Sequence, residues 1–206
     1  MDEGTPLIEV RSISVEDASA LYQLDYDYET DRVYTLRVKN RLEHEADENG
    51  VTNGIAFAFE LQETPVDPPI YRDLSQRSFL YGDPVAKLRS IEGGYVALAN
   101  GKVAGGVLLN VEETRSIVRI VELIVGRQYR RYGIGSLLLR CAADWARKRD
   151  CWAVVLETQN TNFPAIQFYL RNGLEIWGMH QHFYPPGSCA HEIALFMGMR
   201  ISAPSE

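Results

Sequence analysis

The order of apolar and polar residues along the chain predicts a sheet with helices inserted between its strands. Residues 7–13 and 33–38 alternate between apolar and polar positions, as half-buried strands do. Residues 116–125 are apolar on both faces, which is typical of a central strand. Asn100-Gly101 predicts the tight turn of a hairpin. The predicted strands are 7–13, 33–38, 55–61, 95–99, 102–111, 116–125, 152–156, 174–177 and 192–199.

Four helices are predicted from capping residues and from the spacing of apolar side chains. Ser14 is a typical N-cap, and Asn172-Gly173 is a typical helix end. Apolar residues recur as one stripe along 133–149. The predicted helices run from 15 to about 24, from 84 to about 92, from 133 to 149 and from 162 to 171.

Two polar segments interrupt this pattern in the first half of the chain. Residues 41–52 are rich in acidic side chains and end near Asn49-Gly50, which predicts a loop. Residues 65–69 contain three prolines, which predict an extended backbone.

The succession of elements predicts the fold class. The strand, turn, helix and strand within 116–158 form a parallel crossover, which should be right-handed. The hairpin before it is antiparallel. The predicted fold class is therefore α+β, that is, a mixed α/β arrangement around one sheet. A chain of 206 residues is of a size for one domain with a substantial core.

Composition narrows the classes of function. The net charge of −7 and the sequence pI near 5.2 argue against general nucleic-acid binding. They permit a cationic or amine substrate, although acidity also serves solubility. No apolar run is long enough for a membrane span. The N-terminus lacks a signal core, and three cysteines are an odd number, so a cytoplasmic location is expected.

The turn after the central strand has the features of an anion site. A helix begins within it, and freed backbone amides and the helix dipole both favour negative charge there. Gly133 and Gly135 allow a phosphate close to the backbone, and Arg130 and Arg131 add charged donors. The turn therefore predicts a phosphorylated cofactor.

The two most familiar phosphate loops do not match this turn. No Gly-Lys-Ser/Thr sequence is present to hold a nucleotide triphosphate with magnesium. The dinucleotide fingerprint requires a third glycine, and Leu138 occupies that position.

The turn resembles the acyl-CoA motif of the GCN5-related N-acetyltransferases (GNAT). The resemblance rests on Arg130-x-x-Gly133-x-Gly135 after a central strand, and on a second motif running from Asn162 through Phe168-Tyr169 to Gly173-Leu174. Residues 156–162 are similar to the streptothricin acetyltransferase branch of that family. The resemblance implies a GNAT fold: a mixed, mostly antiparallel sheet of about six or seven strands, flanked by about four helices.

The resemblance further implies that one parallel strand pair splays apart to form the acyl-CoA cleft. It implies a single GNAT domain over 1–206, with an elaborated acceptor-side region at about 31–90. Acetyl-CoA would be the co-substrate, with no metal. The residues implied to bind it are Leu123, Ile124, Val125, Arg130, Arg131, Tyr132, Gly133, Ile134, Gly135, Ser136, Asn162 and Phe168.

Three residues are candidates for the acetyl-transfer chemistry. Tyr169 would protonate the leaving thiolate, since a tyrosine of pKa about 10 is a suitable acid for a thiolate of pKa about 8.5. Glu122 is the first choice for the base, because it is an acid within an apolar strand and its burial is costly unless it is paired or useful. Glu157 would bind the substrate amine or serve as the base instead.

Each candidate has a structural alternative. Glu122 could pair with Arg119 or Arg115, Glu157 could be a solvent-exposed charge, and Tyr169 could be a packing aromatic. A tyrosine-rich wall at 22–34 fits a polar ligand, but no tyrosine in it is assigned a role. His180, His182, Cys189 and His191 are weighed as metal ligands, and their spacing matches no compact zinc motif.

The sequence thus predicts an acetyl-CoA-dependent N-acetyltransferase that acts by direct attack in a ternary complex. The expected acceptor is a primary amine of a small cationic compound, either a streptothricin-like antibiotic or a polyamine. A protein N-terminus or lysine is the alternative acceptor, and a non-catalytic acyl-CoA sensor is the alternative of another class. No nucleic-acid or membrane partner is expected, and homodimerisation stays open.

Overall fold

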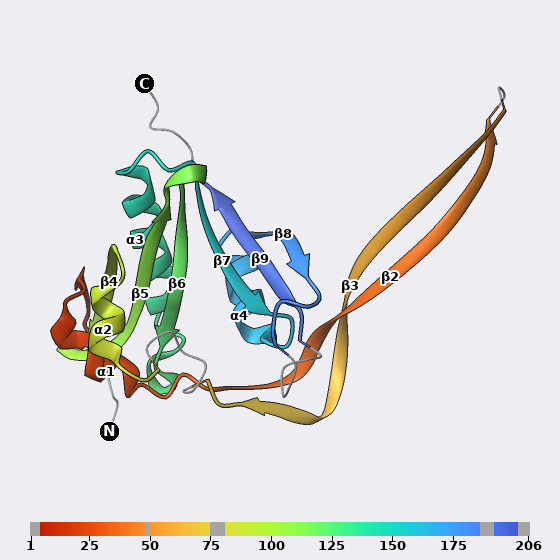
Figure 1. Cartoon of the computed structure of the whole chain (residues 1–206). Coiled ribbons are helices and arrows are strands. Elements are labelled where there is room, and N and C mark those ends of the chain that lie inside the picture. Colours follow the sequence, from red (N-terminus) through yellow and green to blue (C-terminus); the bar gives the residue numbers. More distant parts are fainter. Residues whose placement is uncertain (1–4, 48–49, 75–80, 186–191, 202–206) are drawn as a thin grey trace.

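The body of the molecule is a seven-stranded sheet with helices on both faces. The computed structural model describes residues 5–47, 50–74, 81–185 and 192–201. The strand order is β1-β4-β5-β6-β7-β9-β8 (Figure 1). The strands are β1 (Ile8–Ser12), β4 (Gly93–Ala99), β5 (Lys102–Glu112), β6 (Ile117–Val125), β7 (Ala153–Gln159), β8 (Glu175–His180) and β9 (Ala194–Arg200).

Every strand pair in this sheet is antiparallel except β6 and β7. These two are parallel, and the helix that connects them confirms the predicted crossover. The mixed, mostly antiparallel sheet therefore has the predicted strand number. In the described part of the chain, no helix is long and apolar enough to cross a membrane.

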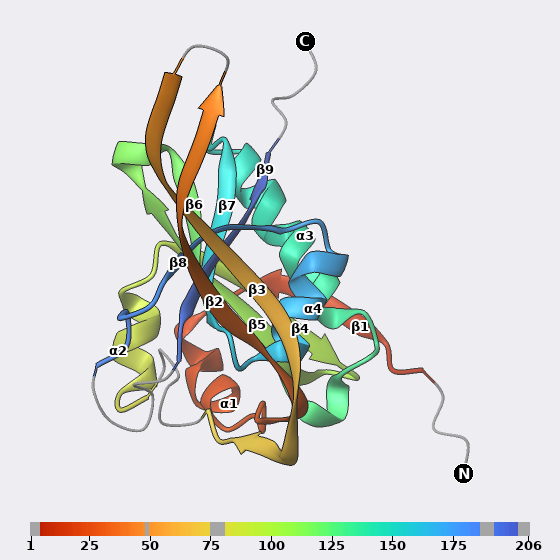
Figure 2. The ribbon, with the colours of Figure 1, turned by 90° about the vertical axis from the view of Figure 1, so that its right-hand side faces the viewer.

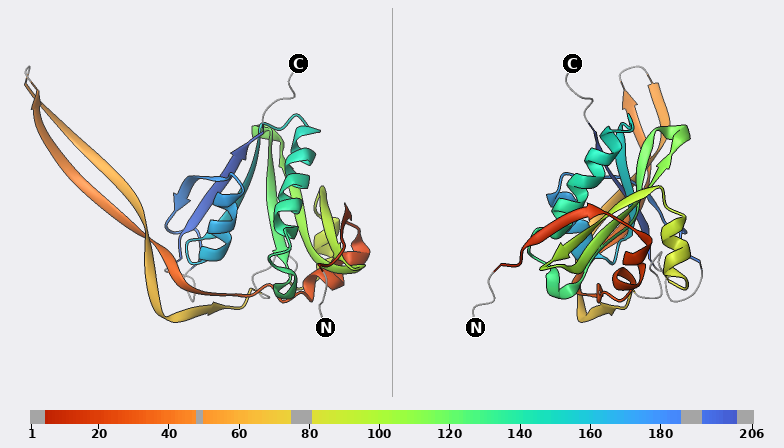
Figure 3. Two further views of the ribbon diagram at one scale, coloured as in Figure 1. Left: turned by 180° about the vertical axis from the view of Figure 1, so that it is seen from behind. Right: turned by 90° about the vertical axis from the view of Figure 1, so that its left-hand side faces the viewer.

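Helices cover the two faces of the sheet and form two apolar cores. Figure 3 shows α3 (Ile134–Arg147) and α4 (Phe163–Arg171) on the same face. The shorter α1 (Ala18–Tyr22) and α2 (Pro84–Arg89) pack on the opposite face. Short 3-10 turns occur at Val15–Asp17, Glu113–Arg115 and Arg127–Tyr129.

The alternation of side chains along the central strands explains this arrangement. In β5, Val107 and Leu109 are buried under α3, whereas Leu108 between them is buried with Leu21 of α1 on the other side. A strand that is apolar at every position needs cover on both faces, because successive side chains point in opposite directions. The four helices supply that cover.

A long two-stranded ribbon, here called the arm, extends away from the body. Its strands are β2 (Tyr28–Asp47) and β3 (Gly50–Arg72), paired antiparallel along most of their length. Figure 2 shows the arm crossing in front of the sheet and rising beyond it. Its root is fixed to the turn before α4: the amide of Tyr34 donates to the carbonyl of Asn160 at 3.0 Å, and Asn160 Nδ2 donates to the carbonyl of Tyr34 at 2.6 Å.

The arm contradicts the loop predicted over 41–52. The backbone continues as paired strands through Asp47 and again from Gly50, with Asp47 opposite Gly50 in register. Local composition misled the prediction because Glu, Asp and Asn are depleted in strands that have a buried face. A ribbon that is held together by backbone hydrogen bonds can contain these polar residues, because the backbone pairing itself needs no buried face. The proline segment 65–69 is extended within β3, as predicted.

Several helix boundaries also differ from the prediction: α1 covers 18–22 rather than 15 to about 24, and α3 covers 134–147 rather than 133–149. Helix α2 ends at Arg89 rather than near 92, because β4 already begins at Gly93. A Cβ at Gly93 would lie 2.7 Å from the indole of Trp145 in α3, so a glycine is needed where the strand passes under that ring.

We predict that Gly105→Ala destabilises the fold by about 1–3 kcal/mol, the usual cost of overpacking. A Cβ at Gly105 would lie 2.5 Å from the carbonyl oxygen of Ile124 in the neighbouring strand β6, and a backbone atom cannot move aside cheaply. Thermal unfolding followed by circular dichroism measures the loss. Gly178→Ala is the matched control, since a Cβ at Gly178 meets no atom within 4 Å. Equal melting temperatures for the two variants would contradict the prediction.

Candidate active site

A cavity of about 1050 Å³ lies where β6 and β7 separate. The two strands are paired at three positions only, from Ile117 opposite Ala153 to Arg119 opposite Val155. Beyond these pairs β6 continues alongside β5, and β7 continues alongside β9. The parallel pair therefore opens into a wedge, as the resemblance implied.

An irregularity in β6 accompanies the separation. Glu122 pairs with Leu108 of β5, whereas Ile120 pairs with the next residue, Leu109, so Val121 is the extra residue of a β-bulge. A bulge bends its strand, increases the local twist and redirects the side chains that follow. Here it directly precedes Glu122 and the residues 123–125, whose edge toward β7 is not paired with a described strand.

The residues predicted for the site come together around this cavity, with one exception. The lining residues that the sequence predicted are Glu122, Leu123, Ile124, Val125, Arg130, Arg131, Gly133, Ile134, Gly135, Ser136, Glu157, Asn162, Phe168 and Tyr169. Tyr132 is 47% exposed and is not among the residues that line the cavity.

The glycine turn forms one end of the cavity. Gly133 has a φ of +79° and is the N-cap of α3. The first bond of that helix runs from the Leu137 amide to the Gly133 carbonyl at 3.0 Å, so the amides of 134–136 precede the helical ladder. A Cβ at Gly135 would lie 2.9 Å from the Phe168 ring, so this glycine lets α3 and α4 approach each other. The turn has the free amides that an anion requires.

Arg130 differs from the simple expectation of a phosphate donor. Its Nη2 donates to the carbonyl of Tyr26 at 2.6 Å, and its Nε is 3.4 Å from the carbonyl of Val125. Burial, followed by the neighbouring charge of Arg127, lowers the pKa of Arg130. Arg130 therefore ties the glycine turn to the segment before β2, while the exposed Arg131 also lines the cavity.

Tyr169 lies on the wall of the cavity within α4 and is 8% exposed. Burial raises the pKa of its hydroxyl well above the ordinary value, and the negative charges of Glu122 and then Glu157 raise it further. The hydroxyl therefore keeps its proton at neutral pH. Both carboxylates line the same cavity, so an acid and two bases share one space.

Glu157 is held at the open end of β7. The hydroxyl of Tyr184 donates to its Oε1. Burial raises the pKa of Glu157, although the Tyr184 hydrogen bond and the charge of Arg119 oppose that shift. Glu157 is thus not the fully solvent-exposed charge that was weighed as its alternative. Tyr184 lies between β8 and β9, in a segment whose sequence carries no recognised motif.

The two arginines proposed as structural partners of Glu122 both pair with another acid. Arg119 forms an ion pair with Glu112, and Arg115 lies 3.4 Å from the same carboxylate. Glu122 itself has a partner of its own and lines the cavity.

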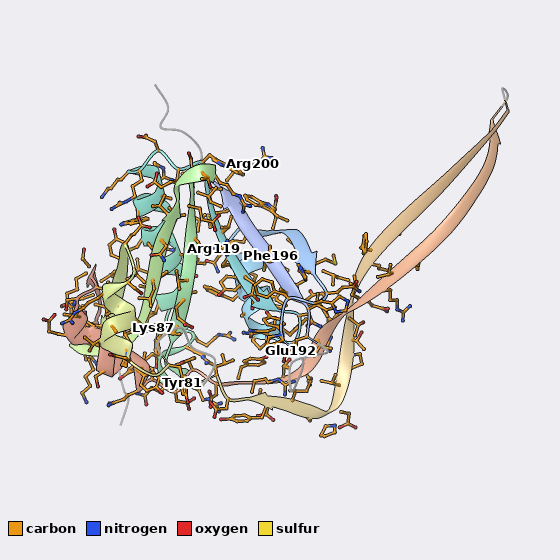
Figure 4. The ribbon with its side chains drawn as sticks, in the orientation of Figure 1. Tyr81, Lys87, Arg119, Glu192, Phe196 and Arg200 are labelled. Atoms are coloured by element: carbon orange, nitrogen blue, oxygen red, sulfur yellow. The ribbon has the colours of Figure 1, made fainter. Side chains whose placement is uncertain are left out.

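A buried polar chain connects the cavity to the root of the arm. The hydroxyls of Tyr28 and Thr161 are 3.4 Å apart, and Thr161 donates to Glu192 Oε1 at 3.3 Å. Glu192 is almost fully buried and lies 3.4 Å from Arg72 at the end of β3. Figure 4 shows Glu192 near the point where the arm leaves the body. Tyr28 and Tyr26, noted but not assigned in the sequence, both line the cavity.

Asn162 has a structural duty at the edge of the cavity. Its side chain accepts a hydrogen bond from the Ala165 amide at 3.3 Å and so caps α4. This cap fixes the start of the helix that carries Phe168 and Tyr169.

Comparisons with known proteins agree with this geometry. The model of the acetyltransferase (GNAT) family matches residues 55–174, which include both sides of the wedge. The chain belongs to the acetyltransferase (GNAT) family. It is 31% identical to a streptothricin acetyltransferase of Streptomyces lavendulae, over 93% of this chain and 94% of that protein.

Solved structures show the same GNAT fold. A nourseothricin acetyltransferase is 28% identical, with a TM-score of 0.73, and the match covers 95% of this chain and 99% of that one. A putative streptothricin acetyltransferase from Bacillus anthracis, solved in complex with acetyl coenzyme A, is 18% identical. Its TM-score is 0.70, with 97% of this chain and 100% of that chain covered.

The metal hypothesis concerns a region that is described only in part. Cys189 and His191 lie outside the described residues. Within the described ranges, no three His, Cys, Asp or Glu side chains are grouped as a metal site.

We predict that Glu157→Gln raises the melting temperature at neutral pH. Burial favours the neutral form of this group, so its ionisation above the raised pKa costs stability that glutamine does not lose. Well below the usual glutamate pKa of about 4.3, at about pH 3, both the folded and the unfolded state bind the proton and the gain disappears. Scanning calorimetry at both pH values measures the difference. Glu9→Gln, at an exposed strand position, is the control, and a lower melting temperature for Glu157→Gln at neutral pH would contradict the prediction.

Proposed function

We propose that this acetyltransferase transfers the acetyl group of acetyl-CoA to a primary amine of a small cationic compound, of the streptothricin-like or polyamine type. The observation that carries the proposal is the buried, protonated Tyr169 beside Glu122 and Glu157 in the wedge between β6 and β7. The name of the relative that is similar over almost its whole length supports the acceptor class.

The residues present fit a bound acetyl-CoA. The amides at the start of α3 and the side chain of Arg131 would hold its pyrophosphate, and a Cβ at Gly133 would meet only open space, so the backbone there is accessible. The unpaired edge of 123–125 would hold the amide-bearing pantetheine arm as an added strand. When bound, the thioester supplies an activated acetyl group and a thiolate leaving group.

The two carboxylates prepare the amine. An alkylammonium of pKa about 10 must lose a proton before it can attack, and Glu122 would accept that proton directly or through water. Glu157 would hold the cationic acceptor at the end of β7, oriented by the hydroxyl of Tyr184. Around Glu122 and Glu157 the two carboxylates favour a cationic acceptor, whereas the arginines that line the cavity serve the anionic donor.

Tyr169 completes the reaction by proton donation. Its raised pKa keeps the hydroxyl protonated but makes it a weaker acid than a thiol of pKa about 8.5, so the donation would begin as a hydrogen bond to the developing thiolate. Uptake of the amine proton by Glu122 would assist the transfer, because the negative charge of Glu122 is one cause of the raised pKa. Backbone amides near Val125 would polarise the thioester carbonyl. The amine attacks the bound donor directly, so no residue of the chain carries the acetyl group.

A thiol-release assay with a panel of amines tests the proposal. We expect acetyl-CoA to release free thiol with streptothricin or a polyamine, and not with peptides that present an N-terminus or a lysine. Release with peptides alone would replace the acceptor class by a protein amine. Binding of CoA without release from any amine would leave an acyl-CoA sensor.

We predict that Tyr169→Phe lowers kcat by about 10²–10⁴-fold, the usual contribution of a general acid, and changes CoA affinity little. The variant keeps the ring and loses only the proton donor. Steady-state kinetics at saturating amine and calorimetric titration with CoA measure the two effects. Tyr95→Phe is the matched control, because Tyr95 is a half-buried tyrosine of β4 whose pKa is also raised by burial. An unchanged kcat for Tyr169→Phe would remove the assigned role.

A further inference from the structure

The arm has one apolar face and one polar face. The register places Leu36 opposite Leu61 and Val38 opposite Phe59, and alternation puts these pairs on one face. The opposite face carries the ion pair between Lys39 Nζ and Glu60, at 2.9 Å. An amphipathic ribbon has a face that is suited to burial.

Among the arm residues whose burial is described, those of the apolar face that the body covers lie at the root of the arm. There Tyr34 packs against Phe163 of α4, with ring centroids 5.5 Å apart, and Leu61 packs against the main core. Two residues further out, Val38 is 43% exposed and Phe59 is 57% exposed. The apolar face thus continues beyond the part that the body covers, and Figure 1 shows the arm diverging from the sheet at this point.

A ribbon of two strands gains little stability by itself. Three or more strands, or a packed face, are needed for a stable sheet in water. The outer strands nevertheless stay paired to their ends, where Leu42 is opposite Ile55 and Asp47 is opposite Gly50. An outer arm of this length therefore calls for a surface that packs on its apolar face.

We propose that the outer arm docks on a second copy of this chain, and that two copies exchange arms around a two-fold axis. The size of the face supports this occupant. Residues 37–47 rise about 3.4 Å each, and two strands are about 10 Å wide in all, so one face is roughly 37 Å by 10 Å. Two such faces, each covered by an equal area of the partner, bury roughly 1,500 Å², the size of a standard stable interface.

The charge of the arm argues against two other occupants. Acidic residues outnumber basic residues between 28 and 72. Nucleic acid and anionic membranes attract basic surfaces, so neither fits this segment. A second copy needs no excess of either sign, because a two-fold interface places the same mixed surface on both sides.

Sedimentation velocity and light scattering test the proposal on the full chain. We expect a dimer at micromolar concentration. The double variant Val38→Thr/Phe59→Thr keeps residues that favour strands but removes the apolar contact, and it should weaken dimerisation more than about a hundredfold, since four apolar side chains are lost per dimer. Lys39→Gln/Glu60→Gln changes the opposite face and should leave the dimer intact. A monomeric wild type, or a double threonine variant that remains a dimer, would overturn the proposal.

Hydrogen exchange gives a second measurement. An arm that is unfolded at every concentration would show no change in amide protection on dilution. Backbone amides of the outer described arm residues 37–39 and 58–60 should lose protection when the wild type is diluted below its dimer dissociation constant, while α3 and the root of the arm at Tyr34 keep their protection. Protection of the arm that does not change with concentration would count against arm exchange. Both measurements are independent of acetyl transfer, so their failure would leave the proposed function standing.

Discussion

The separation of β6 and β7 after three paired positions is the constraint on which the rest of the structure depends. Backbone groups inside a protein must find partners, and a central parallel pair would normally supply them along its whole length. Here that pairing ends at Arg119, shortly before the bulge at Val121, and residues 123–125 line a cavity. The cavity opens in the middle of the sheet, where both cores meet. Its walls are mainly strands and helices, joined by the glycine turn, and sites built on such elements are positioned more precisely than sites on loops.

Burial at this separation sets the electrostatics of the site. Tyr169 and Glu157 are both placed where water is scarce, and each shifts toward its neutral form. The fold therefore holds two side chains, Tyr169 and Glu157, whose ionisation is unfavourable, and such perturbed groups are typical of functional sites. Trp145, which covers Gly93 from α3, and Phe168, which packs on Gly135, anchor the surrounding core tightly. Close packing around the wedge lets the sheet tolerate an unpaired edge at its centre.

The sequence predicted the strand–helix–strand crossover and α4 well, because the sequence signals for these elements are local. Strand periodicity, the Gly133 turn, the helix stripe and the helix that begins near Asn162 are each signalled within one short segment, and the structure contains all of them. The bulge at Val121 escaped prediction because it depends on register with β5, which a single strand does not record. The arm was predicted only in part: residues 33–38 and 55–61 were predicted as strands, whereas the acidic segment 41–52 between them was predicted as a loop although it continues the same pairing. Tyr184 escaped prediction because only the fold brings it to Glu157.

The buried polar chain beside the cavity is made by segments that are distant in the chain, and this explains why its signals in the sequence are weak. Tyr28 at the start of the arm, Thr161 before α4 and Glu192 before β9 form one buried polar chain. The sequence alone assigns none of these residues a role. Their connection becomes visible only in the folded chain. The turn before α4 also holds the root of the arm through Asn160 and Tyr34. The cavity wall at Tyr28 and the root of the arm are therefore held by one set of buried contacts.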